Sequence, residues 1–90
     1  MAVCLLIHIP GGTWEQYQQV EQGLGEPRLG EGQSLHIAGI ADGGLRVVDV
    51  WESRAHFDRF LNDRLGAQLQ SAGVGQPEII EFPVENQVSS

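Results

Sequence analysis

The stretch LRVVDVWES, residues 45–53, decides which fold this sequence predicts. Its β-branched and aromatic residues favour a strand, and Ser53 at its end is a typical helix N-cap. Asp49 lies in the middle of the expected strand, although an unpaired carboxylate costs several kcal/mol to bury there. The stretch therefore predicts a strand that leads into a helix, and it raises the question of which group pairs with Asp49.

Length and composition predict one small globular domain, over residues 1–85, followed by a loose tail at 86–90. A chain of this size buries only about 60–65% of its unfolded surface, so it often gains core contacts by oligomerising. The 12 acidic residues outnumber the 5 basic ones, which gives a net charge of −7. Because an acidic surface repels phosphate, we expect no nucleic-acid partner.

The basic residues and the cysteine restrict the chemistry and the compartment. All basic residues are arginines, which excludes Schiff-base chemistry on a lysine of this chain. Cys4 is the single cysteine, so no internal disulfide can form, as suits a reducing cytoplasm. The apolar run around it is too short for a membrane span and lacks the basic start of a signal peptide. We therefore expect a cytoplasmic protein with no membrane partner, in which Cys4 is a buried apolar residue.

Local signals divide the chain into six elements. Thr13 and Gln16 have the spacing of a helix capping box, and Asp42-Gly43 is a strong signal for a tight hairpin turn. Pro83 favours an edge position for the last strand. The expected order is strand 3–9, helix 14–23, strand 33–40, strand 45–51, a second helix that Ser53 caps and that ends at Gly73, and strand 77–84.

The order β-α-β-β-α-β predicts an α+β, ferredoxin-like fold, a four-stranded antiparallel sheet with two helices on one face. A sheet with one wet face alternates apolar and polar residues, yet residues 3–7 and 45–51 carry apolar groups on both faces. A chain of 90 residues has nothing left to cover the second face. We therefore expect a homodimer that packs sheet against sheet.

The hairpin signal offers a partner for Asp49. With a two-residue or four-residue loop, His36 lies directly across from Asp49, with their β-carbons about 4.5–5.5 Å apart; a three-residue loop moves His36 to the other face. In the paired register, Asp49 would fix the imidazole tautomer and raise the pKa of His36, as a general base needs. Two alternatives remain open. The pair could only satisfy itself at a dimer interface, or Asp49 could pair with Arg46 or Arg54.

Three further aromatic or histidine residues are candidates for ligand contact. Trp14 and Tyr17 lie one turn apart at the start of the first helix, where they could line a pocket or join the core. His8 precedes a Pro-Gly-Gly turn at a strand end, where pocket rims form. His8, His36 and Asp49 are the residue types of an iron-binding facial triad, but no short motif sets their spacing, so we expect no metal site. The helical acidic residues are expected on a solvated face: Glu15, Glu21, Asp58 and Asp63.

The chain resembles the superfamily of the antibiotic biosynthesis monooxygenases, small proteins that form a dimeric α+β barrel. The resemblance rests on the element order, on HIPGGTWEQY at residues 8–17 and on DGGLRVVDVWESRAHFDRF at residues 42–60. It spans nearly the whole chain and implies a homodimer with one cavity per subunit, between sheet and helices. Characterised members are cofactor-free monooxygenases of polyphenolic polyketides, haem-degrading enzymes, and isomerases or cyclases of small metabolites. By position, the resemblance makes these residues counterparts of the groups around the substrate: His8, Trp14, Tyr17, His36 and Trp51.

Together, these observations predict a small tailoring enzyme that needs no cofactor and acts on a hydrophobic, aromatic or polyketide-like metabolite. It would work either as a cofactor-independent monooxygenase, in which O₂ reacts with the deprotonated substrate, or as a cyclase or isomerase. The alternative is a non-catalytic, small-molecule-binding or stress-associated homodimer. The predicted catalytic residues are His36 and Asp49, and the predicted substrate-binding residues are His8, Trp14, Tyr17 and Trp51.

Overall fold

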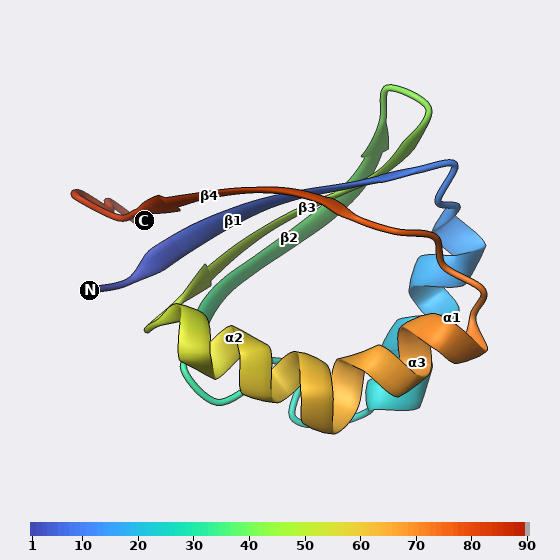
Figure 1. Ribbon diagram of the computed structural model, residues 1–90, viewed down its shortest axis with the longest axis horizontal. Coiled ribbons are helices and arrows are strands. Elements are labelled where there is room, and N and C mark those ends of the chain that lie inside the picture. Colours follow the sequence, from blue (N-terminus) through green and yellow to red (C-terminus); the bar gives the residue numbers. More distant parts are fainter. Residues whose placement is uncertain (90) are drawn as a thin grey trace.

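The computed structural model describes residues 1–89, and its element order confirms the predicted α+β, ferredoxin-like fold. The sheet forms one layer, and the helices form a second layer over one of its faces (Figure 1). Residues 84–89 form no helix or strand, and Ser90, the end of the expected tail, lies outside the described residues. The elements are β1 (Val3–Pro10), α1 (Trp14–Leu24), β2 (Gln33–Ala41), β3 (Gly44–Trp51), α2 (Arg54–Phe60), η1 (Leu61–Leu65), α3 (Gly66–Ser71) and β4 (Glu78–Pro83).

The four strands form one antiparallel sheet in the order β2-β3-β1-β4. The two strands with apolar residues on both faces, β1 and β3, are therefore the central ones. Pro83 lies in β4 at the edge of the sheet, where its missing N–H interrupts no ladder. Within residues 1–89, no helix has both the length and the apolar character of a membrane-spanning helix.

A two-residue turn sets the register between β2 and β3. Asp42 and Gly43 both have positive φ angles, 53° and 74°, and turns of this kind match the right-handed twist of the flanking strands. The ladder that leads away from this turn makes His36 the direct partner of Asp49. The pairing expected from a two-residue loop is therefore confirmed.

The helices begin at the caps that the sequence predicts. The Thr13 hydroxyl accepts a hydrogen bond from the Gln16 backbone N–H at 3.1 Å, and the Gln16 side chain accepts one from the Thr13 N–H at 3.0 Å. The Ser53 hydroxyl accepts a hydrogen bond from the backbone N–H of His56. Both caps satisfy backbone donors that a helix start otherwise leaves without a partner.

The second helical segment differs from the single regular helix that the sequence predicts. Between α2 and α3 the backbone makes one π-helical turn, η1, in which the N–H of Gly66 donates to the carbonyl of Leu61. A β-carbon at Gly66 would lie 2.9 Å from that carbonyl oxygen, so the absence of a side chain permits the wider turn.

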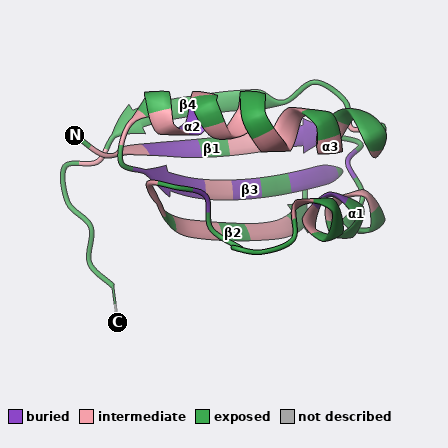
Figure 2. Ribbon diagram, turned by 90° about the horizontal axis from the view of Figure 1, so that it is seen from below, coloured by how far each residue is buried: buried purple, intermediate pink, exposed green. Residues whose placement is uncertain are grey.

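The core lies between the sheet and the helices. Trp51 and Leu5 are fully buried, and Phe57 of α2 packs on them with its ring edge toward the Trp51 indole. A second cluster of buried residues on β1 and β3 packs against Tyr17 of α1. Figure 2 shows that the buried residues concentrate in these two central strands. One set of alternating positions on β3, which includes Asp49, therefore faces the helices.

The opposite face of the sheet is also apolar. Side chains alternate along a strand, so Val48 and Val50 point away from the helices, and Ile37 beside them is 55% exposed. The pairing of the strands arranges this face in rows across the sheet. We call it the outer apolar face. Its first row is Ile37, Val48, Leu6 and Ile80, and its second row is Leu35, Val50, Cys4 and Phe82.

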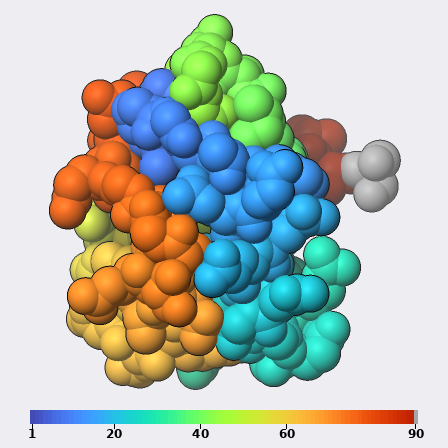
Figure 3. Space-filling view, turned by 90° about the vertical axis from the view of Figure 1, so that its right-hand side faces the viewer, coloured from blue at the N-terminus to red at the C-terminus, as the bar shows by residue number. Residues whose placement is uncertain are grey.

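The two parts of the helical layer, α1 and the segment α2-η1-α3, contact each other at one end of the molecule. Figure 3 shows this side, where α1 lies against α3 and the segment that leads to β4. The side-chain amide of Gln16 donates to the carbonyl oxygens of Ala72 and Gly73, at 3.3 Å each. This contact holds α1 beside the end of α3 and places the inner side chains of α1 over the sheet.

Candidate active site

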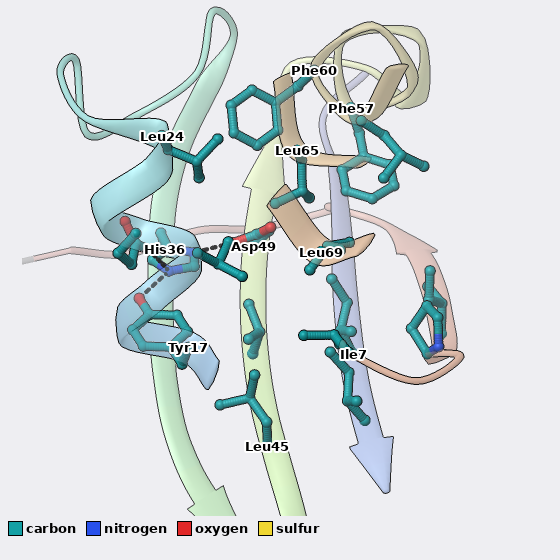
Figure 4. Close-up of a pocket in the computed structure, with 18 of the residues that line it drawn as sticks. Ile7, Tyr17, Leu24, His36, Leu45, Asp49, Phe57, Phe60, Leu65 and Leu69 are labelled. Carbon is teal, nitrogen blue, oxygen red and sulfur yellow. Dashed lines mark hydrogen bonds and ion pairs between the residues drawn. The ribbon is translucent and has the colours of Figure 1, made fainter. Parts of the chain in front are cut away.

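A cavity lies between the sheet and the helices (Figure 4). The volume that the centre of a water molecule can reach inside it is ≈ 120 Å³. Its walls are almost entirely apolar, as is usual for sites that bind small organic molecules. They include Ile7, Ile9, Leu45 and Val47 from the central strands, Val20 and Leu24 from α1, and Phe57, Phe60, Leu61, Leu65 and Leu69 from the segment α2-η1-α3.

A small group of polar side chains lines one part of this cavity. The group comes from four places in the chain, namely α1, the connection after it, β2 and β3. A few convergent polar groups on an apolar wall are the usual arrangement for holding and orienting a ligand. The polar lining residues are Tyr17, Glu21, Arg28, Gln33, His36 and Asp49.

Asp49 has three hydrogen-bond donors around its carboxylate, which explains why a central strand can carry it. The residue is 5% exposed. Its Oδ1 accepts from His36 Nδ1 at 2.7 Å and from Gln33 Nε2 at 3.1 Å, and its Oδ2 accepts from the indole N–H of Trp51 at 3.4 Å. These bonds replace the water that burial removes, and the alternative partners Arg46 and Arg54 pair elsewhere.

His36 has a partner at each ring nitrogen. Its Nδ1 donates to the carboxylate of Asp49, so in the neutral ring Nε2 carries no hydrogen. That Nε2 lies 2.7 Å from the Tyr17 hydroxyl and 3.3 Å from Oε1 of Glu21. The hydrogen bond to Asp49 raises the pKa of His36 above its ordinary value, although partial burial works in the opposite direction. His36 therefore has the fixed tautomer and the raised basicity of a general base.

Tyr17 extends this chain of hydrogen bonds along α1. In Figure 4, Tyr17, His36 and Asp49 are joined in series by dashed lines. The Tyr17 ring lies nearly parallel to the imidazole, with ring centroids 5.9 Å apart, and it stacks on the indole of Trp14, at 4.8 Å. Burial and the Glu21 carboxylate raise the pKa of Tyr17 well above its usual range, so its hydroxyl stays protonated. Tyr17 is therefore a hydrogen-bond donor to the neutral imidazole.

The structure brings together only part of the set that the sequence predicts. Tyr17, His36 and Asp49 line the cavity, whereas Trp14, 41% exposed, reaches it only through its stack on Tyr17. Trp51 is buried in the core beside Phe57 and supports the site through its bond to Asp49.

His8 is not placed at the cavity. It alternates with Ile7 and Ile9, which face the helices, so its side chain lies on the other side of the sheet. There its Nδ1 lies 3.2 Å from Oε1 of Glu78. Because His8 and His36 are on opposite faces, the two-histidine, one-carboxylate set is not assembled. Among residues 1–89, no cluster of three histidine, cysteine or acidic side chains could hold a metal ion.

Three polar residues that line the cavity are not among the site residues that the sequence predicts. Glu21 was expected on a solvated face, but it is half-buried and its carboxylate reaches His36. Its spacing offers a signal, since positions 14, 17, 21 and 24 form one stripe of α1. Gln33 and Arg28 carry no such signal. Gln33 reaches Asp49 from an irregularity in the pairing of β2 with β3, and Arg28 lies in the connection between α1 and β2.

Comparison with known proteins supports the fold assignment. No family model matches the chain, and no curated protein matches its sequence. A candidate antibiotic biosynthesis monooxygenase from Deinococcus radiodurans superposes with a TM-score of 0.65 at 12% identity, over 100% of this chain and 98% of that one. MhuD, in a variant crystallised with two manganese protoporphyrin IX molecules per active site, gives 0.67 at 15% identity, over 98% and 99%. A variant of SnoaB, a cofactor-independent oxygenase from Streptomyces nogalater, gives 0.65 at 10% identity, over 99% and 97%.

These similarities extend over the whole length of each chain. The resemblance to the antibiotic biosynthesis monooxygenase-like proteins is therefore confirmed at the level of the fold. Because fold alone does not define chemistry, the function has to be argued from the site.

Proposed function

We propose that this protein is a small enzyme that removes an acidic proton from a hydrophobic, aromatic or polyketide-like substrate in the cavity between sheet and helices. One observation carries the proposal. Asp49 holds the imidazole of His36 by its Nδ1 at 2.7 Å, which leaves Nε2, beside the cavity-lining side chains of Tyr17 and Glu21, as the base. General bases of this kind contribute about 10²–10⁴-fold to rate.

The surroundings of the base support this proposal. The walls of the cavity are apolar and contain the aromatic rings of Phe57 and Phe60, so they favour an apolar, aromatic ligand. The polar groups gather in one part of the lining, so a ligand that carries a hydroxyl group would be oriented with that group toward His36.

In the monooxygenase-like version, the deprotonated substrate reacts directly with O₂, without flavin or metal. The fold similarity to a cofactor-independent oxygenase favours this version by analogy. In the cyclase or isomerase version, the same base forms the anion and the cavity holds it in a reactive conformation, so that proximity supplies most of the rate.

The two versions differ in their need for O₂. We would incubate the purified protein with an electron-rich hydroquinone under air and under argon, and follow substrate loss by chromatography. The oxygenase predicts turnover only under air. Equal turnover in both atmospheres would eliminate the oxygenase and leave the cyclase or isomerase.

In either version, Asp49→Asn is expected to lower kcat by about 10²–10⁴-fold, because the amide removes the charge that stabilises the imidazolium.

A second candidate function is a non-catalytic binder of small apolar molecules, which the apolar character of the cavity favours. In that case the polar groups contribute little, and His36→Ala and Asp49→Asn would leave the affinity for an apolar probe such as a naphthol unchanged. Unchanged affinity together with no turnover of any hydroquinone would favour the binder over the enzyme.

We also propose that the protein acts as a homodimer in the cytoplasm. The outer apolar face supports the dimer. In its first row the exposed side chains of Ile37 and Ile80 lie on the two edge strands, one on each side of the central strands. The free, buried thiol of Cys4 suits a reducing compartment.

A further inference from the structure

We infer that Tyr17 and Glu21 are alternating partners of His36 Nε2, Tyr17 relaying the proton of a substrate hydroxyl to the imidazole and Glu21 then holding the protonated ring. This inference rests on the proposed proton abstraction. It adds a catalytic role for Tyr17 and makes Glu21 a positioning residue for His36.

The geometry around one nitrogen atom leads to this inference. His36 Nδ1 is committed to Asp49, so only Nε2 can change its hydrogen-bond partner. Two groups of α1 lie within reach of Nε2, namely the Tyr17 hydroxyl at 2.7 Å and Oε1 of Glu21 at 3.3 Å. Residues 17 and 21 are one helical turn apart, so the helix presents both to the same point.

The two partners suit opposite protonation states of the ring. A neutral Nε2 has a lone pair and needs a donor, which the Tyr17 hydroxyl provides. A carboxylate has no hydrogen to give, so Glu21 can bond to Nε2 only when that nitrogen is protonated. The shorter contact in the structure is the one with Tyr17, as expected for the neutral ring.

The proton transfer can therefore be written without a charged tyrosine. The substrate O–H bond breaks, and its proton forms a new O–H bond with the Tyr17 oxygen. At the same time the original Tyr17 O–H bond breaks, and that proton forms an N–H bond with Nε2. The electron pair stays on the substrate oxygen. Afterwards Nε2–H donates to Glu21, and Tyr17 donates its new hydrogen to the substrate anion.

The charges that face His36 favour this transfer. Asp49 approaches from β3, Glu21 from α1, and Arg28 lines the same cavity from the connection between α1 and β2. While His36 is neutral, these groups leave one net negative charge in the cluster. Once His36 is protonated the net charge is zero, so the substrate anion forms beside a neutral cluster and not beside a negative one.

NMR titration of the substrate-free protein tests the inference directly. The signal of His36 is assigned by its absence in His36→Ala, which separates it from His8 and His56. Glu21→Gln removes the acceptor of the protonated ring and is expected to shift the His36 titration midpoint to lower pH. Tyr17→Phe removes the donor to the neutral ring and is expected to shift it to higher pH. Glu15→Gln, an exposed position on the same helix, is the matched control and is expected to leave it unchanged.

Opposite shifts in the two variants support the inference. Shifts in the same direction, or a Glu21→Gln shift no larger than that of Glu15→Gln, would overturn it. The wild-type protein gives a test that needs no variant. Above the titration midpoint, ¹⁵N shifts should show hydrogen on Nδ1 and none on Nε2, and the reverse tautomer would also overturn it.

Turnover separates this inference from the proposed function. If a hydroquinone is turned over, Tyr17→Phe should lower kcat by about 10²-fold or more, and Glu21→Gln should move the lower limb of the pH profile of kcat to lower pH. Opposite titration shifts without any turnover would contradict the proposed enzyme activity but would still support Tyr17 and Glu21 as the two partners of His36. Turnover that is lost in His36→Ala but unchanged in Tyr17→Phe would contradict the proton relay through Tyr17 and still support His36 as the general base.

Discussion

At the scale of single residues, the site depends on how a carboxylate is kept inside a strand. Asp49 accepts hydrogen bonds from an imidazole, an amide and an indole, and each donor comes from β2 or β3. The carboxylate therefore fixes the orientation of these three donor side chains, and they in turn stabilise its charge. The pairing with His36 could be predicted because a tight turn links the two strands. The donors Gln33 and Trp51 could not, since they depend on a local irregularity and on a side-chain direction.

The first prediction concerns the coupling of His36 with Asp49. His36→Ala removes one of three donors from a buried carboxylate and should lower the free energy of unfolding by about 1–3 kcal/mol. The double variant His36→Ala/Asp49→Asn buries no charge, so it should be more stable than the sum of the two single changes implies. Urea denaturation of the four proteins measures this. Strict additivity would show that the two side chains do not stabilise each other.

The second prediction concerns pH. Because the pKa of His36 is raised in the folded state, chiefly by its bond to Asp49, the folded protein holds this proton more tightly than the unfolded chain. The resulting stability is fully present below the unfolded pKa of about 6.5 and is lost as pH rises through the raised folded value. The difference in the free energy of unfolding between wild type and Asp49→Asn should therefore narrow from pH 6 upward. If this difference in unfolding free energy grew as the pH rose above 6, the bond to Asp49 would not be what raises the pKa of His36.

At the scale of secondary-structure elements, the β2-β3 hairpin positions His36 and Asp49, the pair that we propose to be catalytic. Its turn chemistry is local, so Asp42-Gly43 predicts a tight turn, and the two-residue loop in the structure selects the register that pairs His36 with Asp49. The second helical segment is different. Its apolar stripe predicts a helix, but the π-helical turn at η1 depends on the close approach of Gly66 to the Leu61 carbonyl, which no periodicity reveals.

The third prediction tests the turn. Gly43 has a φ of +74° with open space around it, so Gly43→Ala should cost about 1–2 kcal/mol through backbone strain alone. Gly39→Ala, in β2, is the matched control. It also meets open space but needs no positive φ, and it should leave stability unchanged or slightly higher. Thermal denaturation compares the two. Equal effects would mean that the positive φ of Gly43 imposes no strain on an alanine.

At the scale of the whole molecule, the sheet has two apolar faces and the helices cover one of them. The helices bury the inner face, and the outer apolar face leaves Ile37, Ile80 and Phe82 exposed. Contiguous exposed apolar areas mark association surfaces. On β3 this face carries Val48, which is partly exposed, and Val50, which is already buried within the chain.

The fourth prediction is that light scattering will report about twice the chain mass of 9.8 kDa at micromolar concentration. Ile37→Glu places a charge on the outer apolar face and should yield monomers. Ile40→Glu is the control, because Ile40 lies on the same strand, with 52% exposure against 55%, but on the opposite face. A stable wild-type monomer, or equal loss of dimer in both variants, would contradict the sheet-to-sheet assembly.

The sequence by itself determined the four strands, the order of the elements and both helix caps, and it offered the His36–Asp49 pair as the outcome of a two-residue or four-residue loop, which the structure then selected. All of these depend on residues close together in the chain, where spacing and turn chemistry decide the outcome. Only the tertiary structure decided that Tyr17 and Glu21 meet His36 and that His8 faces away from the cavity. These contacts depend on how α1 packs on the sheet and on which side of β1 faces the helices, and no short turn links those elements to one another.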